Sequence, residues 1–173
     1  DKDENTAIKL ATDLIDNFQN IYEDKWLNMM RDKLGLFGED KNDKKLINNL
    51  FDWMKKNKAD YTNTFCNLMN INSYEVYKNN DFINWKNEWK KRSELNNSTK
   101  EKQTKLMKSN NPTVIPRNHK VEEALAEADK GSLDKMKKLL TILKNPYDNQ
   151  SNIQDYQMPA TSSNEKYQTF CGT

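Results

Sequence analysis

The chain has 173 residues, which suits a single domain large enough to bury a hydrophobic core. Its 28 basic and 26 acidic side chains leave a net charge of +2, which excludes a general attraction to nucleic acid or anionic lipid. No apolar run approaches the roughly 20 residues that span a bilayer and no secretory signal opens the chain, so we expect a cytoplasmic protein.

The aromatic residues and methionines argue against disorder, although only 35% of the residues are hydrophobic. Four Trp, seven Tyr, six Phe and seven Met are spread at helical intervals, which a solvated tail would not need. No alternation typical of a strand lasts long enough to predict a sheet. We therefore predict an all-α fold: an irregular array of amphipathic helices, with a C-terminal helical hairpin and a loop-like C-terminal tail.

The first part of the chain predicts three helices. Residues 6–33 carry apolar side chains with the three-and-four spacing of one long amphipathic helix, which Gly35 ends. Asp43 is placed to cap a second helix that finishes near Lys58, and Asp60 is placed to cap a short third one.

The middle of the chain predicts weaker elements. Residues 73–78 suit a single helical turn, and Asp81 then stands where it would cap a helix with Trp85 and Trp89 on one side. Residues 96–109 are nearly all polar, so we expect a mobile loop followed by a weak helix.

Two prolines set the start of the predicted hairpin. Pro112 and Pro116 bar a helix and push the residues before them toward extended backbone. Asn118 then stands where an N-cap belongs, and apolar residues recur behind it at helical spacing, with Glu122 and Glu123 in the first turn.

Turn, cap and stop residues also predict the second helix of the hairpin. Gly131 is placed to end the first helix in a left-handed cap, and Ser132 is placed to cap the next one. Pro146 stops that helix. We expect a helical domain over residues 1–147 and an extended tail over residues 148–173.

Few residues suggest chemistry. His119 is the sole histidine, and as a general base it would need an oriented carboxylate such as Glu122 or Glu123, so we expect it to help fix the start of the hairpin. Arg117 beside it is expected to hold a carboxylate or a backbone carbonyl of a neighbouring segment. The chain has no cysteine pair with zinc-ligand spacing and no glycine-rich phosphate loop, so we predict no metal site and no catalytic residue.

The two cysteines differ in their setting. Cys66 follows Phe65 on a predicted helix and should pack as a small apolar residue. Cys171 lies near the C-terminal end of the chain, where a thiol is accessible to a partner thiol. An idle reduced thiol is the alternative for Cys171.

Several separated motifs, taken in order, resemble the C-terminal part of the selenoprotein O family, also called YdiU. The main motif is Asn111-Pro112, Ile115-Pro116-Arg117-Asn118-His119, Val121-Glu122-Glu123-Ala124-Leu125 and Asn145-Pro146-Tyr147. Similar segments of the family precede it, at Met30-Arg31-Asp32-Lys33-Leu34-Gly35-Leu36 and Ala59-Asp60-Tyr61-Thr62-Asn63-Thr64-Phe65. The ending Tyr167-Gln168-Thr169-Phe170-Cys171-Gly172-Thr173 resembles that of Gram-positive bacterial members.

The resemblance implies a protein adenylyltransferase, a kinase-like enzyme that uses ATP with Mg or Mn to transfer AMP to protein Ser, Thr or Tyr hydroxyls. It also implies that the nucleotide-binding and catalytic residues lie in an upstream kinase-like region, which would be this chain's partner. The chain starts at Asp1 rather than Met, which suits part of a longer protein. We therefore expect it to brace the catalytic lobe, and to bind no ATP or metal by itself.

Cys171 occupies the third position from the end, where vertebrate members of this family carry selenocysteine. The resemblance thus implies a redox role, with the second thiol upstream or at Cys66. Two alternatives remain. One alternative is a non-catalytic interaction module that docks a partner through its tryptophans (Trp26, Trp53, Trp85 or Trp89). The other is a plain structural extension with no redox role.

Overall fold

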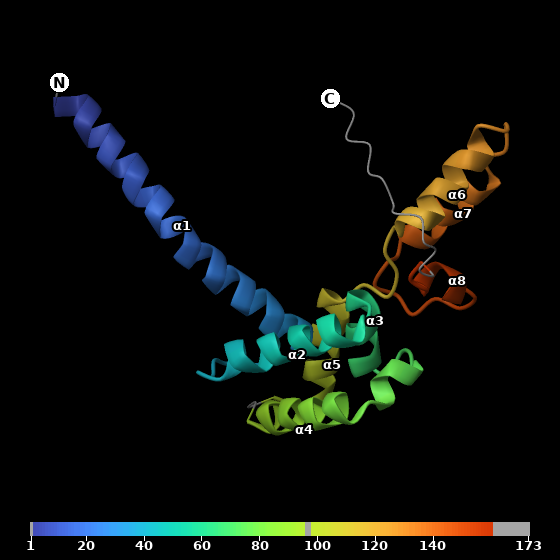
Figure 1. Ribbon diagram of the computed structural model, residues 1–173, viewed down its shortest axis with the longest axis horizontal. Coiled ribbons are helices and arrows are strands. Elements are labelled where there is room, and N and C mark those ends of the chain that lie inside the picture. Colours follow the sequence, from blue (N-terminus) through green and yellow to red (C-terminus); the bar gives the residue numbers. More distant parts are fainter. Residues whose placement is uncertain (1, 96–97, 161–173) are drawn as a thin grey trace.

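The computed structural model describes residues 2–95 and 98–160, and every regular element within these residues is a helix. This confirms the predicted all-α fold. Residues 96–97, part of the expected loop, and residues 161–173, including Cys171, lie outside the described residues. In chain order the elements are α1 (Lys2–Leu34), α2 (Asp43–Asn57), α3 (Tyr61–Leu68), the 3-10 helix η1 (Glu75–Lys78), α4 (Asn80–Glu94), α5 (Lys100–Asn110), α6 (Asn118–Ala128), α7 (Asp134–Leu143) and α8 (Gln154–Gln157) (Figure 1).

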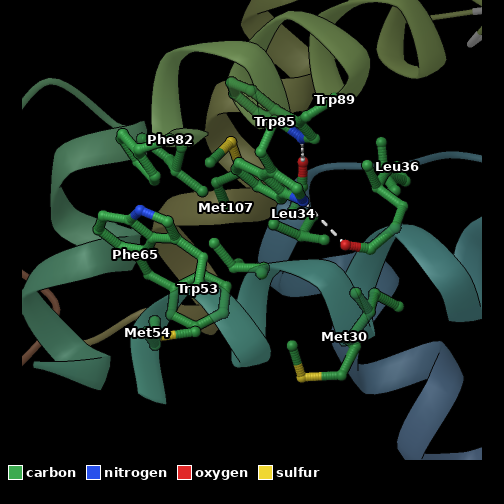
Figure 2. Packing of buried hydrophobic residues seen from close by; sticks show 14 of the residues in the cluster. Met30, Leu34, Leu36, Trp53, Met54, Phe65, Phe82, Trp85, Trp89 and Met107 are labelled. Atoms are coloured by element: carbon green, nitrogen blue, oxygen red, sulfur yellow. Dashed lines mark hydrogen bonds between the residues drawn. The ribbon is translucent and has the colours of Figure 1, made fainter. Parts of the chain in front are cut away.

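The main hydrophobic core joins the C-terminal end of α1 to α2, α3, α4 and α5. Figure 2 shows Trp85, Trp89 and Met107 gathered around Leu34 at the end of α1. The Trp89 indole N–H donates to the Leu34 carbonyl at 2.9 Å, and that of Trp85 donates to the Leu46 carbonyl at 2.8 Å. Each buried indole thus keeps a hydrogen-bond partner, and α4 is tied to both α1 and α2.

Gly35 ends α1 as predicted, with a left-handed φ of +65°. A Cβ at this position would lie 2.6 Å from Cγ of Gln103 and 2.8 Å from Cγ of Met107. Glycine is therefore required twice here, once by the backbone conformation and once because α5 approaches so closely.

The predicted hairpin is present. Helices α6 and α7 lie side by side, joined by a turn in which Gly131 has a φ of +89° (Figure 1). A second, smaller hydrophobic cluster lies at its base, where Val114, Ile142 and Ile153 are buried together. The hairpin is therefore anchored by its own cluster rather than by the main core.

The segment after Tyr147, expected to be loop-like, contains the short helix α8. Ile153, just before α8, is 4% exposed and packs against the base of the hairpin. The first part of the tail is thus held against the hairpin by an apolar contact. The expected domain boundary at residue 147 stays a prediction.

The predicted N-caps were only partly correct. Asp60 caps α3, since its side chain accepts from the backbone N–H of Asn63 at 2.8 Å. The cap of α4 is Asn79 instead of Asp81. Asp81 lies in the first turn, where its negative charge suits the helix dipole, and it pairs with Lys56.

The predicted caps of α2, α6 and α7 were wrong. Asp43 is the first residue of α2, and its carboxylate is engaged by buried arginines. Asn118 already belongs to α6, because Arg117 before it has the extended backbone of a cap. Ser132 lies one residue before the cap of α7, which is Leu133. In all three helices the cap residue's side chain makes no capping hydrogen bond.

Candidate functional site

The motif residues meet where the hairpin joins the rest of the helical body, in a polar contact region that we call the joint. It comprises Asp60, Asn63, Asn111, Thr113, Arg117, Pro146 and Gln157. These residues come from α3, from the extended segment between α5 and α6, from the end of the hairpin and from α8.

Asn111 secures the first side of the joint. It is buried, and its amide Nδ2 donates to the backbone carbonyl of Lys33 at 2.7 Å and to that of Met107 at 2.8 Å. Lys33 in turn donates from its ammonium to the carbonyl of Asn110 at 2.9 Å. These bonds satisfy carbonyls at the C-terminal ends of α1 and α5 and hold the two ends together.

A salt bridge between Arg117 and Asp60 forms the centre of the joint. The Arg117 guanidinium donates to both carboxylate oxygens of Asp60, with both N···O distances at 2.9 Å. The side chains are 9% and 20% exposed, so the pair is largely shielded from water. The expectation that Arg117 holds a carboxylate of a neighbouring segment is therefore met at Asp60.

The charge on Asp60 is stabilised by these contacts. Burial disfavours the ionised carboxylate, but the hydrogen bonds from Arg117 and from the Asn63 backbone N–H outweigh it. The pKa of Asp60 is consequently held below its ordinary value. The same carboxylate thus caps α3 and binds the residue that starts the hairpin.

Thr113 and Gln157 complete the joint. The backbone N–H of Thr113 donates to the Pro146 carbonyl at 2.7 Å, and its hydroxyl donates to the Asp148 carbonyl at 2.7 Å. The Gln157 side chain donates to the Thr113 carbonyl at 3.0 Å, while Asn63 donates to the Gln157 carbonyl, also at 3.0 Å. The segment after the hairpin is therefore bonded both to the extended segment before the hairpin and to α3.

Some predicted motif residues lie outside this network. Pro116, Asn118 and Tyr147 are exposed. Asn145 is also exposed, although its carbonyl accepts from the Gln150 side chain at 2.7 Å. These four residues contribute no side chain to the joint.

His119 lies half-buried in the first turn of α6. Glu123, one of the carboxylates that could have oriented it, accepts from the Lys120 ammonium at 3.2 Å. Lys120 also donates to Asp155 in α8 at 2.7 Å. The structural role predicted for His119 stays a prediction.

Cys66 is buried on α3, and its thiol lies 3.7 Å from the Pro112 carbonyl, to which it donates. Burial, followed by the negative charge of Asp60, raises the pKa of Cys66 to about 11. The reactive thiolate is therefore scarce at neutral pH. The prediction that Cys66 packs as an apolar residue is confirmed.

A buried charge cluster at the end of α1 was not foreseen. Asp43 is fully buried and accepts from Nε of Arg31 and from Nε of Arg92, each at 2.7 Å. Burial opposes its charge, but the arginines and the Asp40 N–H outweigh that effect and hold the pKa of Asp43 low. No local pattern marks these partners, because Arg31 lies among other polar residues such as Asn28, Asp32 and Lys33.

The described residues hold no group of three or more His, Cys, Asp or Glu side chains that could bind a metal ion. The cavity beside Asp43, of about 300 Å³, is also lined by Arg92 and Glu88. Since two arginines neutralise Asp43, this cavity does not suit a magnesium ion with a nucleotide. None of the described helices is long and apolar enough to cross a membrane.

The described part of the chain is thus a helical module whose buried charges hold helices together. The family model described as protein adenylyltransferase SelO matches residues 5–144, and the chain belongs to this family. The resemblance noted from the sequence motifs is confirmed.

Curated relatives support the same assignment. The chain is 58% identical over 172 residues to the protein nucleotidyltransferase YdiU of Pelagibacter ubique, covering 98% of this chain and 36% of the relative. It is 44% identical over 175 residues to the protein of the same name from Bacillus mycoides, covering 99% and 36%. It is 42% identical over 176 residues to the protein nucleotidyltransferase YdiU of Clostridium botulinum, and this match covers 100% of this chain and 36% of the relative. The chain therefore spans about a third of the length of these relatives.

Proposed function

We propose that this chain is the helical C-terminal portion of a protein adenylyltransferase, and that it braces the catalytic region of that enzyme. The observation that carries this proposal is the family match over residues 5–144. The overall reaction joins the α-phosphorus of ATP to a protein Ser, Thr or Tyr hydroxyl oxygen. The bond to the β-phosphate breaks, pyrophosphate leaves, and the hydroxyl proton passes to a base in the catalytic region.

The described residues support a bracing role rather than a catalytic one. The buried carboxylate of Asp43 and the partly buried one of Asp60 are both neutralised by arginine, so neither is available to coordinate a cation. ATP and its Mg or Mn ion would then bind in the kinase-like region. That the chain alone binds neither is a prediction that ATP titration by calorimetry tests, and saturable micromolar binding would overturn it.

The joint supports the bracing proposal because it couples three parts of the chain. Asn111 bonds the body at Lys33, Arg117 at the start of the hairpin bonds the body at Asp60, and Thr113 bonds the tail at Asp148. A bidentate arginine-carboxylate pair fixes both distance and orientation. A hairpin held in this way can present a defined surface to a neighbouring lobe.

For Cys171 we propose a redox role in partnership with a thiol of the catalytic region. Cys66 is a poor second thiol, because it is buried and the pKa of its thiol is about 11. Forming a disulfide would remove two protons and two electrons from the two thiols, taken up by a small-molecule disulfide as oxidant.

The decisive experiment compares adenylylation by the full-length polypeptide with and without residues 1–173, under oxidising and reducing conditions. Loss of activity on truncation supports the bracing role. A redox response that disappears in Cys171→Ser supports the thiol role. An upstream region that is fully active alone and indifferent to redox would refute both.

An interaction module remains the second candidate function, but not through the tryptophans first considered. Trp53, Trp85 and Trp89 are buried, and Trp26 packs against the core. Helix α1 instead carries a series of exposed large apolar side chains, Phe18 among them. Binding of a separate protein by this chain, with no loss of adenylylation on truncation, would favour this candidate.

A further inference from the structure

The N-terminal part of α1 carries an exposed row of large apolar side chains, which we call the α1 stripe. Every residue from 3 to 22 is exposed, and Figure 1 shows this part of α1 extending away from the other helices. The members of the stripe are between 48% and 73% exposed: Ile8, Leu14, Ile15, Phe18, Ile21 and Tyr22.

The stripe has the geometry of a packing face. At about 100° per residue, Ile15, Phe18 and Tyr22 lie within about 60° of one another around the helix. The Phe18 and Tyr22 rings stack, with centroids 6.3 Å apart. Contiguous exposed apolar surface of this kind marks an interaction site, whereas single exposed apolar residues do not.

The centre of the stripe is rotated away from the face that α1 buries in its own core, although the two meet at Trp26, which lies about 20° around the helix from Ile15 and packs against that core. Met30 is fully buried in that core, and it lies 12 residues after Phe18, which places it about 120° around the helix from Phe18. Extending the body formed by α2 to α5 along α1 would therefore leave the side of the stripe around Phe18 uncovered. A second body is needed to cover that side.

We infer that the α1 stripe is the docking face for the catalytic region of the same polypeptide, an inference that rests on the proposed function. Two observations select this occupant. The match to the Pelagibacter relative covers only 36% of that protein, so nearly two thirds of it lies outside the matched part. The family match starts at residue 5, so the stripe lies within the shared region.

The polar faces of the helix indicate the chemistry of the surface that receives it. Residues 3–25 contain six acidic side chains, among them Asp13, Asp16 and Asp24, against two lysines. The catalytic region should thus present an apolar groove rimmed by Lys or Arg side chains. An acidic helix that inserts an apolar stripe into such a groove is a common mode of helix recognition.

Hydrogen exchange measured by mass spectrometry tests the inference on the full-length polypeptide and on the chain of residues 1–173. Amides of residues 6–25 should exchange at least about 10-fold more slowly in the full-length protein, while those of α2 remain unchanged. Phe18→Glu should remove this protection. Asn20→Glu, the same charge placed about 200° around the helix from Phe18, should leave it intact.

Each possible result of the exchange experiment either supports or overturns the docking-face inference. Equal exchange in both proteins, or protection that survives Phe18→Glu, overturns the inference. Protection of the shorter chain that rises with its concentration and is lost in Phe18→Glu assigns the stripe to a second copy and also overturns it. Because the readout is exchange, protection without adenylylation would refute only the proposed function, and adenylylation without protection would refute only the docking face.

Discussion

Removing the Arg117 guanidinium should lower the free energy of unfolding more than removing one partner of an exposed ion pair does. In the wild type the Asp60 carboxylate is only 20% exposed, and Arg117→Ala deprives it of two 2.9 Å hydrogen bonds. Breaking a buried pair from one side costs about 3–5 kcal/mol, and the remaining N-cap bond and partial exposure of Asp60 reduce this to about 2–3 kcal/mol. At about 2–4 °C per kcal/mol for a chain of this size, thermal unfolding should shift down by about 4–12 °C.

The matched control is Lys56→Ala, which removes the partner of Asp81 from a pair whose side chains are 72% and 60% exposed. Such surface pairs contribute about 0–1 kcal/mol, so this variant should unfold close to the wild type. Arg117→Lys, which keeps the charge but loses the bidentate geometry, should fall between the two. If Arg117→Ala costs no more than Lys56→Ala in urea unfolding, the joint does not stabilise this fold and the reasoning fails.

The contribution of the pair should also depend on pH. The pKa of Asp60 is lower in the folded state than its ordinary value, so its stabilisation is present above the unfolded-state pKa of about 4. It is lost as the pH falls through the lower, folded-state pKa. The difference in unfolding free energy between wild type and Arg117→Ala should therefore be constant from about pH 6 to 8 and shrink below about pH 4. A difference that persists unchanged to about pH 2.5 would contradict this origin.

Three further predictions concern the body. Gly35→Ala should lower the free energy of unfolding by about 1–2 kcal/mol for the left-handed backbone, and by a further amount for the clash with α5. Gly38→Ala is the control, because Gly38 has a φ of +67° but open space around it, so this variant should lose only the backbone part. Equal urea midpoints for the two variants would refute the close approach of α5. Asp43→Asn should cost about 3–5 kcal/mol in the same assay, because two buried arginines lose their counter-charge, and a loss below about 1 kcal/mol would contradict this. In Cys171→Ser, the remaining Cys66 should resist iodoacetamide at about pH 8, where on the order of 0.1% is thiolate, and react only after denaturation; rapid native labelling would refute its burial.

Local signals along the chain were sufficient for the helices and their breaks. Apolar residues at three-and-four spacing predicted α1, α2 and the hairpin, while Gly35 and Pro146 marked ends that the structure shares. These features depend on residues a few positions apart, since helix periodicity, left-handed glycines and proline geometry are properties of the local backbone. The motif at Arg117 likewise indicated a partner carboxylate, but not which one.

The sequence by itself thus determined that this chain is helical, where most helices end, and to which family it belongs. Only the tertiary structure decided how the charged residues are used. Asp43 has the spacing of a cap, yet arginines 12 and 49 residues away draw its carboxylate into the core. Asp60 bonds an arginine 57 residues later, a contact that no local pattern encodes because it depends on how the helices pack. The same limit applies to α1, whose apolar spacing predicts a buried face, while the fold leaves most of that face in solvent within this chain.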